Sequence, residues 1–258
     1  MLHDTSAPYL LLEAPRGLRD VGASVKGEVA VGVAASYSGG PFRKRLVLAS
    51  GSPRRRELVS AFAVPFEISP PVSPEPSIRA DETPEAYVTR LALGKAREVA
   101  GRTVSAIVVG ADTVVVHREV MGKPSDAAEA TRMLLLLRGV SHRVVSGIVA
   151  LDSETAEWSA AVESTRVEVR CYTDEELENY VKSGEPFDKS GGYGVQDSTF
   201  RPAVVVEGCY LNVVGLPLCE VQQLLELRGI DATIRHGWRP PDECVGCRLQ
   251  FGNRQGGK

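Results

Sequence analysis

Residues 46–58 read Leu46-Val47-Leu48-Ala49-Ser50-Gly51-Ser52-Pro53-Arg54-Arg55-Arg56-Glu57-Leu58. The first four are a short apolar run, which is typical of a buried strand. Ser52 fits the N-cap of a following helix, and Pro53 fits its first position, where the missing N–H costs little. A strand that passes through small residues into a helix start presents unpaired backbone N–H groups. This stretch therefore predicts a strand–turn–helix unit with an anion site.

Short β-branched runs and helical patterns alternate along the chain on both sides of Asp112, which favours an α/β domain. We expect Asp112 at a strand end or bulge, between the two β-branched runs of 106–117. Helices are expected at 84–100, 126–138, 174–183 and 217–228. Strands are expected at 143–151, 164–170, 203–206 and 209–214, with the last two joined by a hairpin turn at Glu207-Gly208.

The composition excludes several classes of protein. The chain has 258 residues, of which 43% are hydrophobic and 24% are charged, so collagen-like, coiled-coil and wholly disordered structures are excluded. Lys and Arg number 30 against 33 Asp and Glu, a net charge of −3, which gives no general attraction to nucleic acid or to an anionic membrane. The apolar runs Met133–Leu137 and Ala203–Val206 are too short to span a bilayer. We expect no nucleic-acid or membrane partner.

The two ends of the chain differ from its middle. Residues 1–43 form a predicted N-terminal extension that we expect to be poorly ordered, residues 44–229 the domain, and residues 230–258 a C-terminal tail. No export signal is evident, and the odd number of scattered cysteines gives no disulfide framework, so a cytoplasmic location is expected. Cys244-Val245-Gly246-Cys247 has half of a zinc-ribbon spacing, but no second pair follows. A structural zinc is therefore not expected within one chain, although two chains could share one.

Several segments carry candidate chemistry, each with a plainer alternative. Arg54 and Arg55 oppose the dipole of the predicted helix unless an anion binds, and the alternative is a solvated basic turn. Asp112 follows a hydrophobic strand, where a lone aspartate can simply form a turn. Lys123 precedes Pro124 and means little alone. Residues 185–196 combine two acids, a lysine, glycines and Gln196, which suits a metal-bound triphosphate, whereas the alternative is a flexible surface loop.

Taken together, these segments resemble the Maf (septum formation) nucleotide pyrophosphatases over about residues 45–228. The matching pieces are Leu48 to Arg55, Gly110 to Val115, Lys123-Pro124, Ser141 to Val144, Gly184 to Gln196 and Val213 to Leu218. The form of Asp188 to Gln196 is similar to the branch that hydrolyses dTTP and UTP. One departure is Asp197-Ser198, where the family usually has glycine after the glutamine, and this puts the local loop shape in doubt.

The resemblance implies a Maf/ITPase-like fold, a mixed twisted sheet flanked by helices with a central cleft. It implies Asp112 as the proton acceptor and Arg54, Thr113 and Gln196 as the residues that govern base choice. The residues implied near the phosphates are Ser52, Arg55, Lys95, Lys123 and Lys189. The residues implied near a metal ion are Glu75, Asp112 and Asp188.

The implied reaction is attack of water on the α-phosphorus of dTTP or UTP, which releases pyrophosphate and the monophosphate. An ordinary aspartate has a pKa near 3.9, too low for an efficient base toward free water, so a divalent cation, Mg²⁺ or Mn²⁺, is expected to activate the water. The alternatives are a nucleotide-binding regulator of cell division, which would bind without turnover, and a pyrophosphatase for modified nucleotides. The resemblance also suggests a homodimer.

Overall fold

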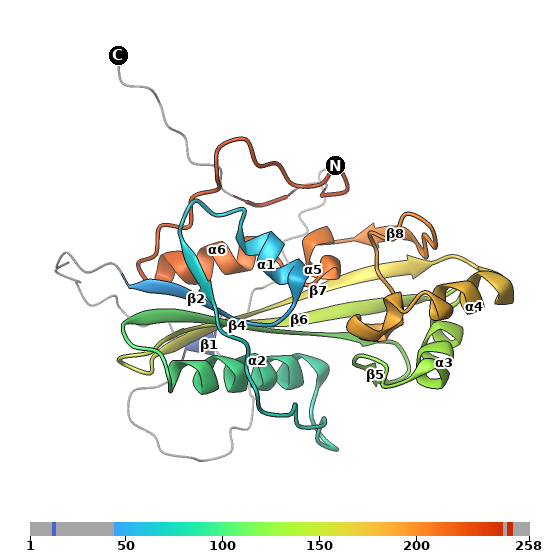
Figure 1. The fold of residues 1–258 in the computed structure, drawn as a ribbon, viewed down its shortest axis with the longest axis horizontal. Helices are drawn as coiled ribbons and strands as arrows, with labels where there is room; N and C mark the ends of the chain where they lie inside the picture. The colour runs from blue at the N-terminus through green and yellow to red at the C-terminus, as the bar shows by residue number, and fades with distance from the viewer. Residues whose placement is uncertain (1–11, 14–43, 245–246, 250–258) are drawn as a thin grey trace, which may run out of the picture.

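The computed structural model describes residues 12–13, 44–244 and 247–249 (Figure 1). The predicted extension 1–43 thus lies outside the described residues, apart from Leu12–Glu13. Within the described residues the strands form one eight-stranded sheet in the order β1-β7-β6-β4-β2-β3, with β5 on β4 and β8 on β7. The strands are β1 (Leu12–Glu13), β2 (Arg45–Ala49), β3 (Phe66–Ile68), β4 (Ala106–Val116), β5 (Val120–Met121), β6 (Ser141–Asp152), β7 (Trp158–Val169) and β8 (Ala203–Glu207).

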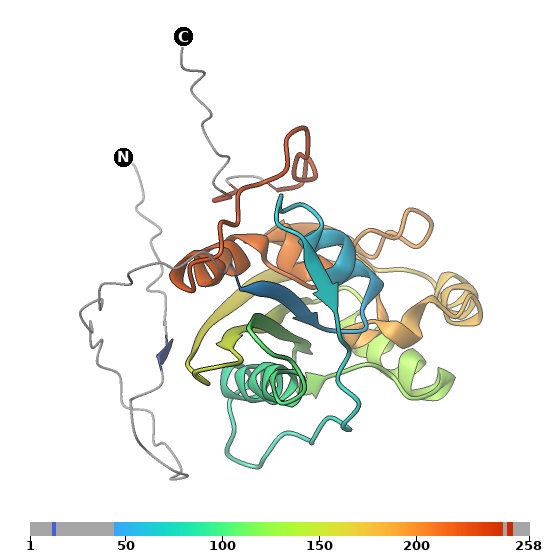
Figure 2. The ribbon, with the colours of Figure 1, turned by 60° about the vertical axis from the view of Figure 1, so that its left-hand side comes forward.

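The predicted α/β class and mixed sheet are confirmed, because β2 is parallel to β3 and β4 whereas β4, β6 and β7 pair antiparallel. The helices are α1 (Pro53–Val59), α2 (Pro84–Ala100), α3 (Ala127–Leu137), α4 (Asp174–Lys182), α5 (Tyr210–Val214) and α6 (Leu218–Leu227), with 3₁₀ turns η1 (Glu185–Asp188) and η2 (Ser190–Gly192). Helix α2 covers one face of the sheet, and α1, α5 and α6 cover the other (Figures 1 and 2). In the part of the chain described, no helix is long and apolar enough to cross a bilayer.

The helix starts follow the predicted capping chemistry. The Ser52 hydroxyl accepts the backbone N–H of Arg55 at 3.4 Å, with Pro53 at the first position of α1. Thr173 and Glu176 form the predicted reciprocal capping box of α4. These features depend only on residues close in sequence, which is why the sequence predicts them.

Two predictions about secondary structure are wrong. Asp112 does not lie at a strand end or bulge, because β4 runs unbroken from Ala106 to Val116 and pairs Asp112 with Gly147 of β6. Residues 210–214 form helix α5 rather than a strand, so Glu207-Gly208 leads from β8 into a helix and is not the predicted hairpin turn. A short apolar run fits either structure, and here a buried asparagine decides: Asn212 donates to the carbonyl of Val144 at 2.9 Å and contacts the Thr165 hydroxyl at 3.0 Å.

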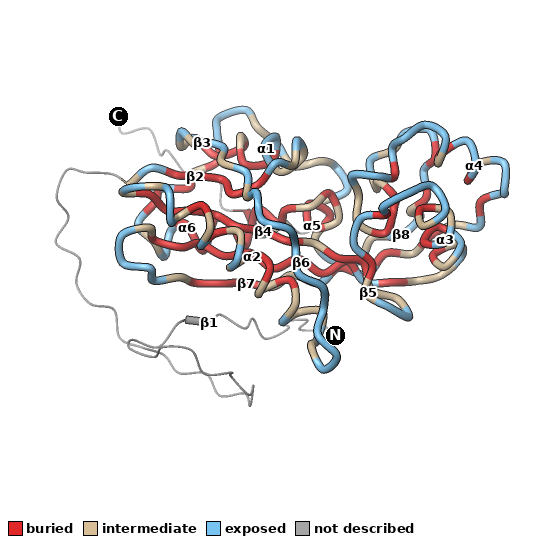
Figure 3. Tube along the Cα trace, turned by 60° about the horizontal axis from the view of Figure 1, so that its bottom comes forward, coloured by how far each residue is buried: buried red, intermediate tan, exposed pale blue. Residues whose placement is uncertain are grey.

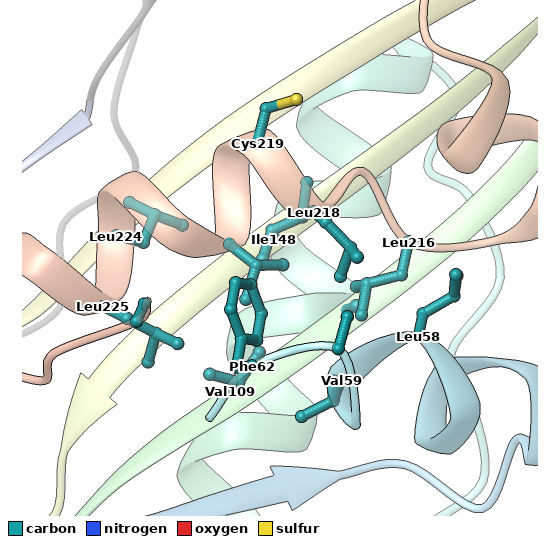
Figure 4. Packing of buried hydrophobic residues seen from close by; sticks show 14 of the residues in the cluster. Leu58, Val59, Phe62, Val109, Ile148, Leu216, Leu218, Cys219, Leu224 and Leu225 are labelled. Atoms are coloured by element: carbon teal, nitrogen blue, oxygen red, sulfur yellow. The ribbon is translucent and has the colours of Figure 1, made fainter. Parts of the chain in front are cut away.

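The largest part of the core lies between the sheet and helices α1, α5 and α6 (Figures 3 and 4). Phe62, Ile148 and Leu218 are among its fully buried side chains. This packing continues past residue 229, the predicted end of the domain. Ile230, Ala232 and Ile234 are buried in the same cluster, and Ile234 forms a β-bridge with Phe62. The first residues after α6 are therefore part of the packed body.

Two glycines of the sheet lie directly against the backbone of helix α2. A Cβ placed on Gly110 of β4 would lie 2.2 Å from the carbonyl oxygen of Ala92, and one on Gly147 would lie 2.6 Å from the backbone of Val88. Both contacts are with helix backbone, which cannot move aside as a flexible side chain can. These glycines therefore limit the distance of α2 from β4 and β6, and with it the position of Lys95 of α2, which contacts Asp112.

We expect Gly110→Ala to lower the free energy of unfolding by about 2–3 kcal/mol, because the added methyl forces α2 away from the sheet. Chemical denaturation of the purified chain measures this loss. The matched control is Gly94→Ala on α2, where an added Cβ meets nothing within 4 Å. That control should be stabilising by about 0.5–1 kcal/mol, because alanine is the better helix former. Equal denaturation midpoints for Gly110→Ala and the parent chain would contradict the close approach.

Candidate active site

A cavity of about 440 Å³ opens where the start of α1, the second half of β4, the 185–197 segment and the end of α5 meet. Most of the site residues predicted from the sequence line this cavity. They are Ser52, Arg54, Arg55, Thr113, Lys123, Asp188, Lys189 and Gln196. The remaining three, Glu75, Lys95 and Asp112, form a separate neighbouring cluster. The predicted residues therefore come together as two adjacent groups rather than around one hollow.

The cavity lies beside a short gap in the sheet. Strand β2 pairs with β4 up to Gly110, and β5 pairs with β4 only from Val115. In the described part of the chain, residues 111–114 of β4 thus have no strand partner on that side. Side chains take the place of the missing strand, because Arg55 donates to the Ala111 carbonyl at 2.8 Å and the Ser190 hydroxyl donates to the Thr113 carbonyl at 2.7 Å.

Arg55 connects three elements at this gap. Besides its bond to Ala111, its Nε donates to the carbonyl of Gly215 at 2.9 Å and its second terminal nitrogen donates to the Thr113 hydroxyl at 3.0 Å. The Thr113 hydroxyl also lies 2.8 Å from that of Ser146, the residue opposite it on β6. Arg55 therefore fixes α1, β4 and the end of α5 to one another while keeping N–H donors to spare.

Asp112 lies on the other face of β4, since consecutive residues of a strand point to opposite faces. Its carboxylate is 2.5 Å from the ammonium of Lys95 on α2, and its side chain is only 7% exposed. The same ammonium lies 2.6 Å from the carboxylate of Glu75. Two acids thus share one lysine, and the acid on β4 is the buried one.

The two groups interact around the gap in the sheet. The positive charges of Lys95 and Arg55 both act on Asp112, and those of Lys95, Lys123 and Arg55 act on Glu75. Arg55 and Lys123 line the cavity, so their charges link it to the acid–lysine cluster. The charges of the cavity and of the acid–lysine cluster therefore act on each other around β4.

The pKa values of the two acids are shifted in opposite directions. Burial raises the pKa of Asp112, and the Lys95 and Arg55 charges only partly oppose that rise. Burial acts in the same direction on Glu75, but Lys95, Lys123 and Arg55 outweigh it and lower the pKa of Glu75. Asp112 is thereby the better proton acceptor of the pair, while Glu75 stays ionised.

The 185–197 segment places acidic and basic side chains at the cavity, and these form ion pairs. Asp188 binds Arg54 through a 2.7 Å ion pair, and its backbone carbonyl accepts a second bond from the same guanidinium at 2.9 Å. Lys189 contacts the carboxylates of Glu185 and Asp188, each at 2.8 Å. Burial would raise the pKa of Asp188, but Lys189 and Arg54 outweigh it and lower that pKa. Both cations that line this side of the cavity are therefore paired with acids of the segment.

The residues fit a divalent cation in part. Glu75 and Asp112 already hold one cation, the Lys95 ammonium, between two carboxylates, and one or two carboxylates with substrate phosphates are the usual set for Mg²⁺. Asp188, the third predicted ligand, is held instead by Arg54 and Lys189. In keeping with this, no three His, Cys, Asp or Glu side chains among the described residues are grouped closely enough to hold a metal ion.

Four contributors to the site were not predicted. Ser146 is detectable in principle, because it stands opposite Thr113 once β4 and β6 are paired in register. Glu185 lies within the quoted segment, but only the structure shows that it binds Lys189. Ser190 and the carbonyl of Gly215 act through contacts with β4 and Arg55 that no local pattern encodes.

Comparison with known proteins agrees with this architecture. The family model for the Maf-like protein matches residues 45–228. A dTTP/UTP pyrophosphatase of Syntrophotalea carbinolica is 44% identical over 187 residues, which cover 71% of this chain and 84% of that protein. One of Geobacter sulfurreducens is 44% identical over 189 residues, 73% of this chain and 97% of that protein. One of Dehalococcoides mccartyi is 36% identical over 208 residues, which cover 79% of this chain and 91% of that protein. On its sequence, its fold and the residues gathered at the cavity, the chain belongs to the Maf family.

Proposed function

We propose that this chain hydrolyses dTTP and UTP to the monophosphate and pyrophosphate. The observation that carries the proposal is the gap in the sheet beside β4, where a cavity lined by Arg54, Lys123 and Lys189 adjoins the buried Asp112. Cations in a cavity suit a triphosphate, and a buried acid beside them suits proton transfer. The Maf relatives that match most of the chain are named for these two substrates.

In this proposal the cavity residues bind and position the triphosphate. Lys123 and Lys189 neutralise the charge that develops on the leaving pyrophosphate, which is the main contribution that proteins make to phosphoryl transfer. Arg55 keeps its bonds to Ala111 and Gly215 and offers its remaining N–H donors to a phosphate oxygen. Ser52 lies at the same edge of the cavity, beside the start of α1.

Asp112 accepts the proton of the attacking water, and Lys95 orients its carboxylate. Glu75 and Asp112 would hold Mg²⁺ or Mn²⁺, which when bound lowers the pKa of a coordinated water. Lys95 lies between these two acids, so a bound cation would compete with its ammonium for their carboxylates. Burial of Asp112 serves the reaction by bringing its pKa closer to neutrality.

Gln196 is proposed to select the base. Thymine and uracil present a carbonyl acceptor beside an N–H donor, and a side-chain amide matches both, whereas cytosine reverses the pattern. We expect Gln196→Glu to lose the donor and to lower the ratio of kcat/KM for dTTP over dCTP by about tenfold or more. Steady-state kinetics with both nucleotides measure the ratio. Gln223→Glu, at an exposed glutamine of α6, is the control, and an unchanged ratio in Gln196→Glu would count against the role.

The experiment that tests the proposed function is a panel of natural and modified nucleoside triphosphates, each with Mg²⁺ and with Mn²⁺. Pyrophosphate and nucleoside monophosphate are measured separately, so that cleavage at the α-phosphorus is distinguished from loss of the terminal phosphate. We expect equal amounts of both products, with dTTP and UTP the best substrates. Binding of nucleotides without turnover, or a clear preference for modified bases, would contradict the proposal.

A further inference from the structure

Gln196 lies in a four-residue turn on the wall of the cavity, in the segment between α4 and β8 (Figure 1). The backbone N–H of Asp197 donates to the carbonyl of Gly194 at 3.2 Å, so Val195 and Gln196 are the central residues of the turn. Val195 packs against the core between the sheet and helices α1, α5 and α6, whereas Gln196 is exposed. The direction of the Gln196 side chain therefore depends on how the two ends of the turn are anchored.

Two separate contacts fix the chain before the turn. The backbone N–H of Gly194 donates to the hydroxyl of Tyr180, a buried residue of α4, at 3.1 Å. The hydroxyl of Tyr193 lies 2.6 Å from Nε2 of His142, which is a buried residue of β6. These bonds connect the residues just before the turn to a helix and to the sheet. Loss of either contact leaves the other in place.

The chain after the turn is fixed by the Asp197 side chain. Oδ1 of Asp197 accepts the backbone N–H of Thr199 at 2.9 Å and that of Phe200 at 2.6 Å. These two bonds close a compact loop that places the ring of Phe200 on the ring of Tyr180, with ring centres 4.1 Å apart and planes 10° apart. The carboxylate of Asp197 therefore connects the turn of Gln196 to a stacked aromatic pair on α4.

Asp197 also lines the cavity, where a carboxylate can act either on a ligand or on its own loop. The contacts favour the loop, because a single oxygen accepting backbone N–H groups two and three residues further on is the way that aspartate organises a turn. The triphosphate proposed for this cavity is anionic, so a carboxylate would repel its phosphates. Asp197 is also a residue at which the sequence departs from the Maf pattern, and a glycine there would have no side chain to accept these bonds.

We propose that Asp197 is a positioning residue for base selection, because it fixes the turn that presents Gln196 to the nucleobase. This inference rests on the proposed function, in which Gln196 selects the base. Without the carboxylate, the N–H groups of Thr199 and Phe200 lose their acceptor, and the loop no longer holds the end of the turn in one place. Discrimination between bases should then fall, whereas the phosphate side of the cavity, which other elements supply, should keep its contacts.

The test compares three variants of Asp197 by the ratio of kcat/KM for dTTP over dCTP. Asp197→Ala removes the acceptor, and we expect the ratio to fall by about fivefold or more. Asp197→Asn loses the charge but keeps a carbonyl oxygen that can accept both N–H groups, so the ratio should stay within about twofold of the parent. Asp197→Glu keeps the charge but moves it away from the backbone by one methylene, so it should lose the ratio as alanine does.

The matched control is Asp231→Ala. Oδ1 of Asp231 accepts the backbone N–H of Thr233 at 3.2 Å in a turn that does not line this cavity, so the same change of chemistry there should leave the ratio unchanged. In the background of Gln196→Glu, Asp197→Ala should add no further change, because the amide that Asp197 positions is already gone. A merely structural role would lower kcat/KM for both nucleotides alike and would not move the ratio.

Dissociation constants of dTTP and dCTP, measured by calorimetry, separate this inference from the proposed function. A chain that prefers dTTP in binding but releases no pyrophosphate would contradict the proposed hydrolysis, and the ratio of the two constants would then test Asp197 in the same three variants. Circular dichroism establishes that each variant has folded. An unchanged ratio in Asp197→Ala, a loss in Asp197→Asn with a normal ratio in Asp197→Glu, or a parent chain without base preference would each overturn the inference.

Discussion

Replacing Asp112 by asparagine is expected to lower kcat for pyrophosphate release by about 10³-fold, because general-base catalysis by a positioned side chain contributes 10²–10⁴-fold. The amide keeps the size of the carboxylate but accepts no proton at neutral pH. The fold should persist, because Lys95 retains Glu75 as a partner at 2.6 Å. Pyrophosphate release from dTTP at saturating substrate and metal measures the loss, and circular dichroism follows the fold.

The matched control for this variant is Asp152→Asn. Asp152 is also a largely buried aspartate with a lysine partner, Lys44, but it lies at the far end of β6 from the cavity. Its replacement should change stability rather than turnover of the folded enzyme. If Asp112→Asn keeps its turnover, or if Asp152→Asn loses as much, Asp112 is not the proton acceptor.

Arg55→Lys is expected to lower kcat/KM by about 100-fold, although the charge is kept. An ammonium on a flexible stem cannot reproduce the planar fork that reaches Ala111, Thr113 and Gly215 at once. Acceptors that lose a buried donor cost about 1–3 kcal/mol each, so the gap beside β4 should loosen and the phosphate site should lose its shape. Kinetics and chemical denaturation should therefore change together.

The control is Arg56→Lys, the next residue of α1, whose side chain is exposed. This variant has the same change of chemistry one position along the helix, and we expect less than a twofold effect on kcat/KM. A normal kcat/KM for Arg55→Lys would show that charge alone suffices at this position. In that case the geometry of the guanidinium could not be what holds the site together.

How much of the structure the sequence predicts depends on how far apart along the chain the interacting residues lie. The Ser52 cap and the Thr173 capping box follow from neighbours within three residues, so they could be predicted. The place of Asp112 inside β4 depends on pairing with Gly147, which lies far along the chain, and helix α5 depends on the contacts of Asn212 with two distant strands. Such partners become known only when the sheet is assembled.

The same holds for the site. Arg54, Lys123 and Gln196 were named from motifs, and all three line the cavity. The sequence did not predict that Asp112 lies on the opposite face of the sheet from these three residues. Side chains along β4 alternate between the two faces, but which face is covered by α2 becomes known only when the sheet is assembled.

The gap in the sheet has a further consequence, for self-association. A strand with free backbone groups offers a template on which another chain can add, and proteins commonly protect such edges with charged side chains. Here the carbonyls of Ala111 and Thr113 are occupied by Arg55 and Ser190. The enzyme can therefore leave residues 111–114 of β4 without a strand neighbour on one side without inviting intermolecular β-pairing there, and loss of both side chains at once should make the protein prone to aggregation.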